Sequence, residues 1–233
     1  MRYVFVDCRW ALDDPGLGRR QYEAGHIPGA AFLDVGRDLA GPAGARGRHP
    51  LPQADDFARA AWAAGIGSGR FVVAYGTLGG AERLWWLLRH FGHEACAVID
   101  LDAWRGPLAR GEEPVERAEF EPEERGGDLI EAPELERRLG ELVVVDARLP
   151  ARFRGEPNPI DRVPGRIPGA LSAPWNETPP ELPSGELVAY CGSGITACVT
   201  LHRLHLGGRE GRLYPGSWSE WEQHGELPRL TGV

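Results

Sequence analysis

The sequence repeats itself, and this repeat limits the possible folds more than any other feature. Short motifs of the first half return in the same order in the second half. The matching motifs are Asp7-Cys-Arg9 with Asp146-Ala-Arg148, Gly25-His-Ile-Pro-Gly-Ala30 with Gly165-Arg-Ile-Pro-Gly-Ala170, Val73-Ala-Tyr75 with Val188-Ala-Tyr190, and Trp104 with Trp218. Ordered recurrence of this kind predicts two copies of one domain. We expect domains at 1–105 and 128–233, joined by an exposed linker at 106–127 that is rich in Pro, Gly, Glu and Arg.

Within each copy, short apolar runs alternate with helical patterns. The segments 71–75, 97–99, 142–145 and 186–190 are typical of buried strands, and 54–65, 81–91 and 198–206 are typical of helices. This alternation predicts an α/β fold in which each domain is a doubly wound, mainly parallel sheet with helices on both faces. Ligand sites in such sheets lie beyond the carboxyl ends of the strands.

The composition argues against several classes of protein. A net charge of −8 and a pI near 5.4 disfavour a nucleic-acid or anionic-membrane partner. No apolar run approaches the roughly 18 residues of a membrane span, and the first residues already follow a strand pattern, so we expect no signal peptide and a cytoplasmic protein. All 26 basic residues are arginine. The lack of lysine excludes Schiff-base chemistry and cofactors attached through lysine.

One of the four cysteines occupies a position suited to a sulfur anion. Cys191 follows a predicted strand and lies on a turn that leads into a predicted helix. Free backbone N–H groups and the positive end of a helix dipole both favour an anion there. Gly192 and Gly194 allow successive N–H groups to turn inward. The other cysteines, Cys8, Cys96 and Cys198, lie in apolar patterns and are predicted to be core residues.

These motifs resemble the tandem-domain sulfurtransferases, namely rhodanese (thiosulfate sulfurtransferase) and 3-mercaptopyruvate sulfurtransferase. The resemblance covers nearly the whole chain and rests on the repeated Gly-x-Ile-Pro-Gly-Ala motif, Arg83-Leu-Trp-Trp86, Arg152-Phe-Arg-Gly155, Cys191-Gly-Ser-Gly-Ile-Thr-Ala197 and Gly216-Ser-Trp-Ser-Glu-Trp221. It implies a duplicated fold in which only the C-terminal copy keeps the cysteine. It also implies a persulfide on Cys191, no metal and no organic cofactor. The sulfur would pass from a small-molecule donor to cyanide, thioredoxin or another thiol.

Matching the family motifs residue by residue gives further site candidates. The resemblance implies that Cys191, Ser193 and Thr196 are catalytic, with Ser193 assisting proton movement. The persulfide loop would also contain Gly192, Gly194, Ile195 and Ala197. The donor would contact Arg152, Arg162, His49 and Trp10.

The sequence departs from the family pattern in one place and leaves other functions open. The acidic residue that completes a serine relay in some relatives falls at Gly36, with Asp38 two positions away. Thiosulfate-preferring relatives carry cations at the two positions after the cysteine, where this chain has Gly192 and Ser193, so 3-mercaptopyruvate is the expected donor and thiosulfate the alternative. A cysteine phosphatase would need arginine where Ala197 stands. A non-catalytic sulfur-carrier or binding module remains a further alternative.

Overall fold

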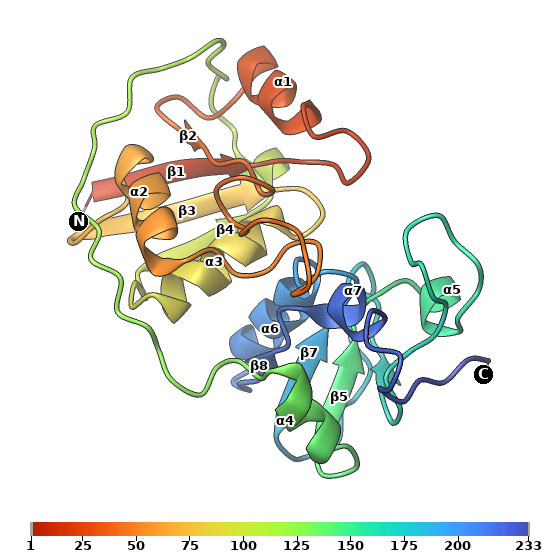
Figure 1. The fold of residues 1–233 in the computed structure, drawn as a ribbon. Coiled ribbons are helices and arrows are strands. Elements are labelled where there is room, and N and C mark those ends of the chain that lie inside the picture. Colours follow the sequence, from red (N-terminus) through yellow and green to blue (C-terminus); the bar gives the residue numbers. More distant parts are fainter. Residues whose placement is uncertain (1, 233) are drawn as a thin grey trace. The chain divides into compact units, whose positions relative to one another are not determined.

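The computed structural model describes residues 2–232, which divide into two compact units. Unit 1 comprises Met1–Gly41 and Leu51–Gly126, and unit 2 comprises Pro42–Pro50 and Gly127–Val233. Each unit contains its own parallel sheet and its own helices (Figure 1).

Unit 1 is built on a four-stranded parallel sheet with the strand order β2-β1-β3-β4. Its strands are β1 (Arg2–Cys8), β2 (Ala31–Phe32), β3 (Arg70–Gly76) and β4 (Cys96–Ile99), and its helices are α1 (Leu17–Ala24), α2 (Ala54–Ala63), α3 (Gly80–His90) and the 3-10 helix η1 (Leu101–Ala103). The four consecutive residues from Val72 to Tyr75 are all buried. A continuous buried run of this kind is expected for a strand covered on both faces.

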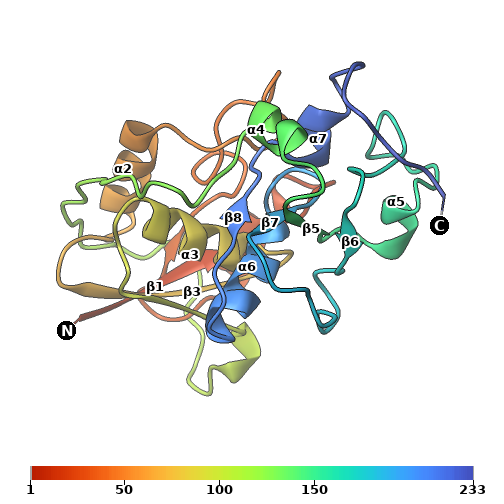
Figure 2. The ribbon, with the colours of Figure 1, turned by 90° about the horizontal axis from the view of Figure 1, so that it is seen from below.

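Unit 2 repeats this arrangement with the strand order β6-β5-β7-β8, again all parallel (Figure 2). Its strands are β5 (Val143–Asp146), β6 (Leu171–Ser172), β7 (Leu187–Tyr190) and β8 (Arg212–Leu213), and its helices are α4 (Ala132–Arg137), α5 (Pro150–Phe153), α6 (Ala197–Leu206) and α7 (Ser217–Trp221). Its core packs around Tyr190, Tyr214, Trp218 and Trp221, which are all at most 1% exposed. The predicted α/β fold with two parallel sheets is confirmed.

The sequence repeat corresponds to a repeated set of buried contacts. Arg9 Nε donates to Asp7 at 3.0 Å, and Arg148 Nε donates to Asp146 at the same distance. In each unit the same guanidinium group also donates to the carbonyl of the glycine that opens the Gly-x-Ile-Pro-Gly-Ala motif, at 2.7 Å and 2.8 Å. Asp146 is the last residue of β5 and Asp7 the second-last of β1, so this ion pair ties the motif to the carboxyl end of the first strand in each unit.

The boundaries of the units differ from the predicted domains in two places. The segment predicted as an exposed linker, 106–127, belongs almost entirely to unit 1. Ala109 forms an antiparallel bridge with His26, and the Glu113 carboxylate accepts hydrogen bonds from His26 at 3.0 Å and from the Gly29 N–H at 2.7 Å. The acidic side chains of Glu112, Glu113 and Glu116 thus have partners on unit 1. Conversely, Pro42–Pro50 packs with unit 2.

Two further expectations concern the cysteines and the membrane. Cys8 and Cys198 are fully buried, as predicted, whereas Cys96 is only partly buried. Burial raises the pKa of the Cys96 thiol to about 12.

Among residues 2–232, no helix has the length and apolar character needed to cross a bilayer.

Arg148 occupies the centre of a buried charge network in unit 2. Its side chain is 0% exposed, and its partners Asp146 and Asp161 are 0% and 1% exposed. Burial alone would lower the pKa of Arg148, but the charge and hydrogen bond of Asp146, together with the charge of Asp161, outweigh burial, and the pKa lies above its ordinary value. The guanidinium therefore stays charged and compensates two carboxylates that water does not reach.

We predict that Arg148→Ala destabilises the protein strongly, because it leaves buried carboxylates without a counter-charge. Breaking a buried pair in this way costs about 3–5 kcal/mol. The matched control is Arg154→Ala, which removes an exposed ion pair with Glu156 and should cost less than about 1 kcal/mol. Urea unfolding followed by circular dichroism measures both. Equal losses for the two variants would show that the buried network does not hold the unit together.

Candidate active site

Cys191 directly follows β7, at the carboxyl end of the unit 2 sheet. The loop from Cys191 to Thr196 then leads from β7 into α6, which begins at Ala197 (Figure 1). The cysteine is only 2% exposed. Ligand sites in parallel α/β sheets form at this end of the strands, and Cys191 lies there.

The sulfur of Cys191 receives a backbone hydrogen bond from its own loop. The N–H of Gly194 points at Sγ at 3.2 Å. This turn requires glycine, because Gly194 has φ +81° and an added Cβ would lie 2.5 Å from the carbonyl oxygen of Pro215. A backbone N–H aimed at this atom is a hydrogen-bond donor available to a group bound on sulfur.

The short helix α7 fixes the loop from the other side. The N–H of Trp218 donates to the Cys191 carbonyl at 3.0 Å, and the N–H of Ser219 donates to the Gly192 carbonyl at 2.9 Å. The Cys191 N–H in turn donates to Ser217 Oγ at 3.1 Å. Ser217 is fully buried and adopts φ +52°, a conformation uncommon for a residue other than glycine. These serine roles were not predicted, although both residues lie in the quoted Gly-Ser-Trp-Ser-Glu-Trp motif.

Ser193 and His49 are brought together. His49 Nδ1 and Ser193 Oγ are 2.8 Å apart and share a hydrogen bond. His49 reaches the loop because Pro42–Pro50 belongs to unit 2. Thr196 is partly exposed at the start of α6, and its hydroxyl makes no side-chain hydrogen bond within residues 2–232. Ile195 is buried beside it.

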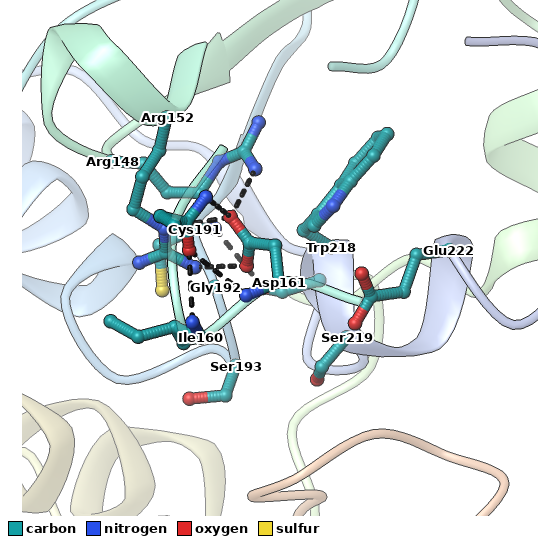
Figure 3. Close-up of polar contacts among 12 residues, drawn as sticks. Arg148, Arg152, Ile160, Asp161, Cys191, Gly192, Ser193, Trp218, Ser219 and Glu222 are labelled. Atoms are coloured by element: carbon teal, nitrogen blue, oxygen red, sulfur yellow. Dashed lines mark hydrogen bonds and ion pairs between the residues drawn. The ribbon is translucent and has the colours of Figure 1, made fainter. Parts of the chain in front are cut away.

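Arg152 is close to the cysteine loop but already has an anionic partner. Its Nε and Nη2 donate to the two carboxylate oxygens of Asp161 at 2.8 Å and 2.5 Å. Arg148 also approaches this carboxylate, at 3.4 Å (Figure 3), and Asn158 Nδ2 donates to it at 3.2 Å. Burial would raise the pKa of Asp161, but the hydrogen bond and charge of Arg152, together with Arg148, outweigh burial and lower it. Asp161 is therefore a permanent negative charge at the site.

A second arginine, which the sequence did not reveal, lies next to Arg152. Arg48 Nη2 donates to the Gly192 carbonyl at 3.1 Å. A Cβ added to Gly192 would lie 2.6 Å from Arg152 Nη2 and 2.9 Å from Arg48 Nη2. The one available signal was its position directly before the predicted His49 in Arg48-His-Pro-Leu-Pro52.

Arg162 makes no comparable contact with the loop within residues 2–232. It is exposed and makes no hydrogen bond or ion pair within the described part of the chain, residues 2–232. It lines a cavity of about 300 Å³ together with Arg48, Ile160, Glu222 and Gln223.

Trp10 and Asp38 belong to unit 1. The Trp10 N–H donates to the Thr77 hydroxyl at 3.0 Å. The Asp38 carboxylate accepts the Asp34 N–H at 2.8 Å and pairs with Arg37 at 2.7 Å. The roles expected of Trp10 and of an acidic residue at Gly36 or Asp38 stay predictions.

Across residues 2–232, no group of three or more His, Cys, Asp or Glu side chains is arranged to hold a metal ion.

Comparisons with protein families, with curated proteins and with solved structures all find rhodanese-like proteins or sulfurtransferases. The family described as "Rhodanese-like domain" matches residues 131–224. A Pseudomonas aeruginosa protein named "Probable 3-mercaptopyruvate sulfurtransferase" is 41% identical, over 98% of this chain and 92% of that protein. A Mycobacterium tuberculosis protein named as a candidate thiosulfate sulfurtransferase is 32% identical, over 98% and 90%. The solved 3-mercaptopyruvate sulfurtransferase of Leishmania major superposes with a TM-score of 0.77 at 28% identity, covering 95% of this chain and 70% of that one.

We predict that Gly194→Ala destabilises the protein more than an equally left-handed glycine elsewhere. A Cβ at Gly194 combines backbone strain with a 2.5 Å approach to the Pro215 carbonyl. Gly208→Ala is the control, because Gly208 has φ +75° and nothing within 4 Å of the added Cβ, so only the strain of about 1–2 kcal/mol applies. Urea unfolding should show a larger loss for Gly194→Ala. Equal losses would mean that the loop yields easily at this contact.

Proposed function

This chain belongs to the family of the 3-mercaptopyruvate and thiosulfate sulfurtransferases, and from that premise we propose that it moves sulfur from 3-mercaptopyruvate to an acceptor through a persulfide on Cys191. The observation that carries the proposal is the Gly194 N–H, which points at Cys191 Sγ at 3.2 Å in the loop after β7. Such a donor stabilises the thiolate before reaction and the persulfide anion after it.

The first half-reaction transfers one sulfur atom to the enzyme. The Cys191 thiolate attacks the thiol sulfur of the donor, and a new S–S bond forms. The C–S bond of the donor breaks, and its electron pair stays on carbon as the enolate of pyruvate. A proton on that carbon completes pyruvate, and the enzyme retains Cys191 as a persulfide. This is covalent catalysis with two separate half-reactions.

The second half-reaction returns the enzyme to its starting state. A nucleophilic acceptor, such as cyanide, thioredoxin or another thiol, attacks the outer sulfur of the persulfide. The S–S bond breaks, and its electron pair returns to Cys191 as the thiolate. In the first half-reaction the donor carbon keeps the electron pair of the broken C–S bond as the cysteine sulfur is formally oxidised, and in the second the acceptor takes up the sulfane sulfur. Each half-reaction therefore balances between protein and substrate without an external oxidant or reductant. Ping-pong kinetics follow from this scheme.

Ser193 and His49 are suited to the proton movement of the first half-reaction. The donor thiol loses its proton, and the carbon of the departing enolate gains one. The hydrogen bond between Ser193 Oγ and His49 Nδ1, at 2.8 Å, provides a hydroxyl and an imidazole, groups that accept and donate protons near neutral pH. We assign the Thr196 hydroxyl to the persulfide loop, where it can donate to the outer sulfur.

The choice of 3-mercaptopyruvate over thiosulfate rests on the charge of the site. 3-Mercaptopyruvate carries one carboxylate, which Arg152 can hold through a charge-assisted hydrogen bond. Thiosulfate is a compact dianion, and the two positions after the cysteine, Gly192 and Ser193, offer it no charge. Asp161 also offsets part of the Arg152 charge. A site with this balance favours the donor with the smaller negative charge.

We infer a cytoplasmic location and place Trp10 and Arg162 among the donor contacts. The location is supported by the free thiol state of all four cysteines. Arg162 is supported by its exposed guanidinium on the cavity that Arg48 also lines. Trp10 is supported by its match to the family pattern.

We predict that Cys191 is the only residue that becomes persulfidated. Incubation with 3-mercaptopyruvate should add the mass of one sulfur atom, and cyanide or dithiothreitol should remove it. Cys191→Ser should lose the adduct, because an alcohol at this position is not ionised near neutral pH. Cys198→Ser is the control and should retain the adduct, since its sulfur donates to the Gly194 carbonyl and is fully buried. Intact-protein mass spectrometry measures all three proteins. An adduct that persists on Cys191→Ser would refute the assignment.

We predict that kcat/KM with 3-mercaptopyruvate exceeds kcat/KM with thiosulfate by at least about tenfold, which corresponds to about 1.4 kcal/mol of transition-state binding. Cyanide at a fixed, saturating concentration serves as the acceptor for both donors, and thiocyanate formation measures both rates. The common acceptor makes the second half-reaction identical in the two assays. A higher value with thiosulfate would replace the proposed donor and leave the persulfide mechanism unchanged.

A further inference from the structure

We propose that unit 2 has a second ligand site at the C-terminal end of α6. This site binds a small organic molecule with one negative charge and an apolar part, such as a carboxylate or a sulfonate, and it is independent of the sulfurtransferase reaction. The cysteine loop leads into the opposite end of α6. A helix of this length spans about 15 Å, so the two sites lie at opposite ends of one helix.

The first observation is a cavity of about 520 Å³ between this helix end and the loop that follows β6. Cavities that hold small organic ligands measure about 300–1,000 Å³. The loop contributes residues 176–179, and the helix end contributes Arg203, Leu204, Gly207 and Arg209. The cysteine loop, residues 191–196, does not line this cavity, so its volume is separate from the site described above.

The second observation is that the two arginines at this cavity have no acidic partner. Arg203 Nη1 donates to the Glu177 carbonyl at 2.7 Å. Arg209 donates through Nη1 and Nη2 to the carbonyls of Leu182 and Pro183, at 3.0 Å and 2.8 Å. Within residues 2–232 neither guanidinium forms an ion pair with a carboxylate. A carbonyl accepts a hydrogen bond but leaves the full positive charge of the guanidinium uncompensated.

The same backbone contacts hold both guanidinium groups in place before a ligand arrives. A guanidinium carries more N–H donors than the one that Arg203 and the two that Arg209 use in these contacts. The remaining donors can meet an anion in the cavity. A cation that is already fixed loses little conformational freedom on binding, which favours affinity.

The end of a helix normally disfavours an anion, because its last carbonyls carry a partial negative charge. Here the carbonyls of Arg203, Leu204 and His205 accept backbone N–H groups from the turn 207–209. Gly208 allows this turn through its φ of +75°. These carbonyls are therefore occupied, and the two guanidinium groups dominate the local charge.

The remaining lining residues define the class of ligand. Among them only Glu177 is acidic, so two arginines and one glutamate leave one positive charge in excess. Leu204 and Pro179 provide apolar surface, and the methylene stems of the arginines add to it. Asn176 and Thr178 offer an amide and a hydroxyl whose side-chain atoms make no hydrogen bond within residues 2–232. A monoanion with an apolar part matches this lining in both charge and polarity.

The test compares two fluorescent probes that differ only in charge. The first is 8-anilinonaphthalene-1-sulfonate, a monoanion, and the second is N-phenyl-1-naphthylamine, the same ring system without the sulfonate. Fluorescence titration of the whole chain gives a Kd for each. We expect Arg203→Ala and Arg209→Ala each to weaken binding of the sulfonate by about tenfold, the effect of losing one charge-assisted hydrogen bond. Binding of the neutral amine should change by less than about twofold in either variant.

Two further variants complete the titration. Arg154→Ala removes an exposed arginine paired with Glu156 and should leave both Kd values unchanged. Glu177→Gln removes the negative charge of the lining and keeps the Arg203 contact, which is made to the backbone carbonyl of this residue. It should tighten binding of the sulfonate by about threefold or more. This variant decides the question even where an alanine variant loosens the loop 176–183.

Backbone ¹H–¹⁵N chemical shifts locate the bound sulfonate. We expect it to shift the amide signals of Gly207, Gly208 and Arg209 and to leave those of Gly192 and Gly194 unchanged. Shifts confined to the cysteine loop would overturn the proposal, and so would the absence of saturable binding up to about 1 mM, the limit of weak affinity. Equal losses of both probes in the arginine variants would also overturn it, because charge would then contribute nothing.

Discussion

The active-site side of unit 2 depends on a row of alternating charges that begins at the sheet and ends at the cysteine loop. Asp146 ends β5, Arg148 binds it, Asp161 follows, and Arg152 is last. The first three side chains are at most 1% exposed. In a medium of low polarity each charge requires its neighbour, and the guanidinium of Arg148 also lies 4.8 Å from the ring centroid of Trp218. The orientation of Arg152 is thus set by the end of a strand rather than by its own short helix.

The two units share the first part of this row, but the residue after the matching tyrosine is a glycine in unit 1 and a cysteine in unit 2. Unit 1 keeps the pair of Asp7 and Arg9, yet Gly76 stands where unit 2 has Cys191. A Cβ on Gly76 would lie 2.7 Å from the carbonyl oxygen of Cys8 on the neighbouring strand. In unit 1 the neighbouring strand therefore leaves no room for a side chain at the position where unit 2 has its cysteine. Both units have the aspartate–arginine ion pair, but only unit 2 has space for a side chain at this point.

Much of the fold and of the candidate site could be predicted from the sequence. The contacts that could not be predicted share one physical reason. Strands β3, β4, β5 and β7 and the Cys191 loop follow from apolar runs and glycine spacing, which are local properties. Asp161 and Arg48 lie in segments without periodicity, and their importance arises only when the chain brings them to Arg152 and Gly192. The acidic segment that contains Glu113 looked solvated for the same reason, since its partner His26 is remote in sequence. Pairing between distant irregular segments leaves no pattern in composition.

The segment Pro42–Pro50 shows how far the catalytic unit extends beyond the sequence repeat. It lies within the first copy by position, yet it packs with unit 2 and contributes Arg48 and His49 to the loop. Its path is fixed by Gly47, whose left-handed backbone allows contact with Gly216 that no other residue would permit. The C-terminal repeat alone contains the cysteine, the N–H donor and one arginine, but it lacks the imidazole and the second guanidinium. A unit defined by repeats would therefore contain the cysteine loop without the two side chains, Arg48 and His49, that contact it.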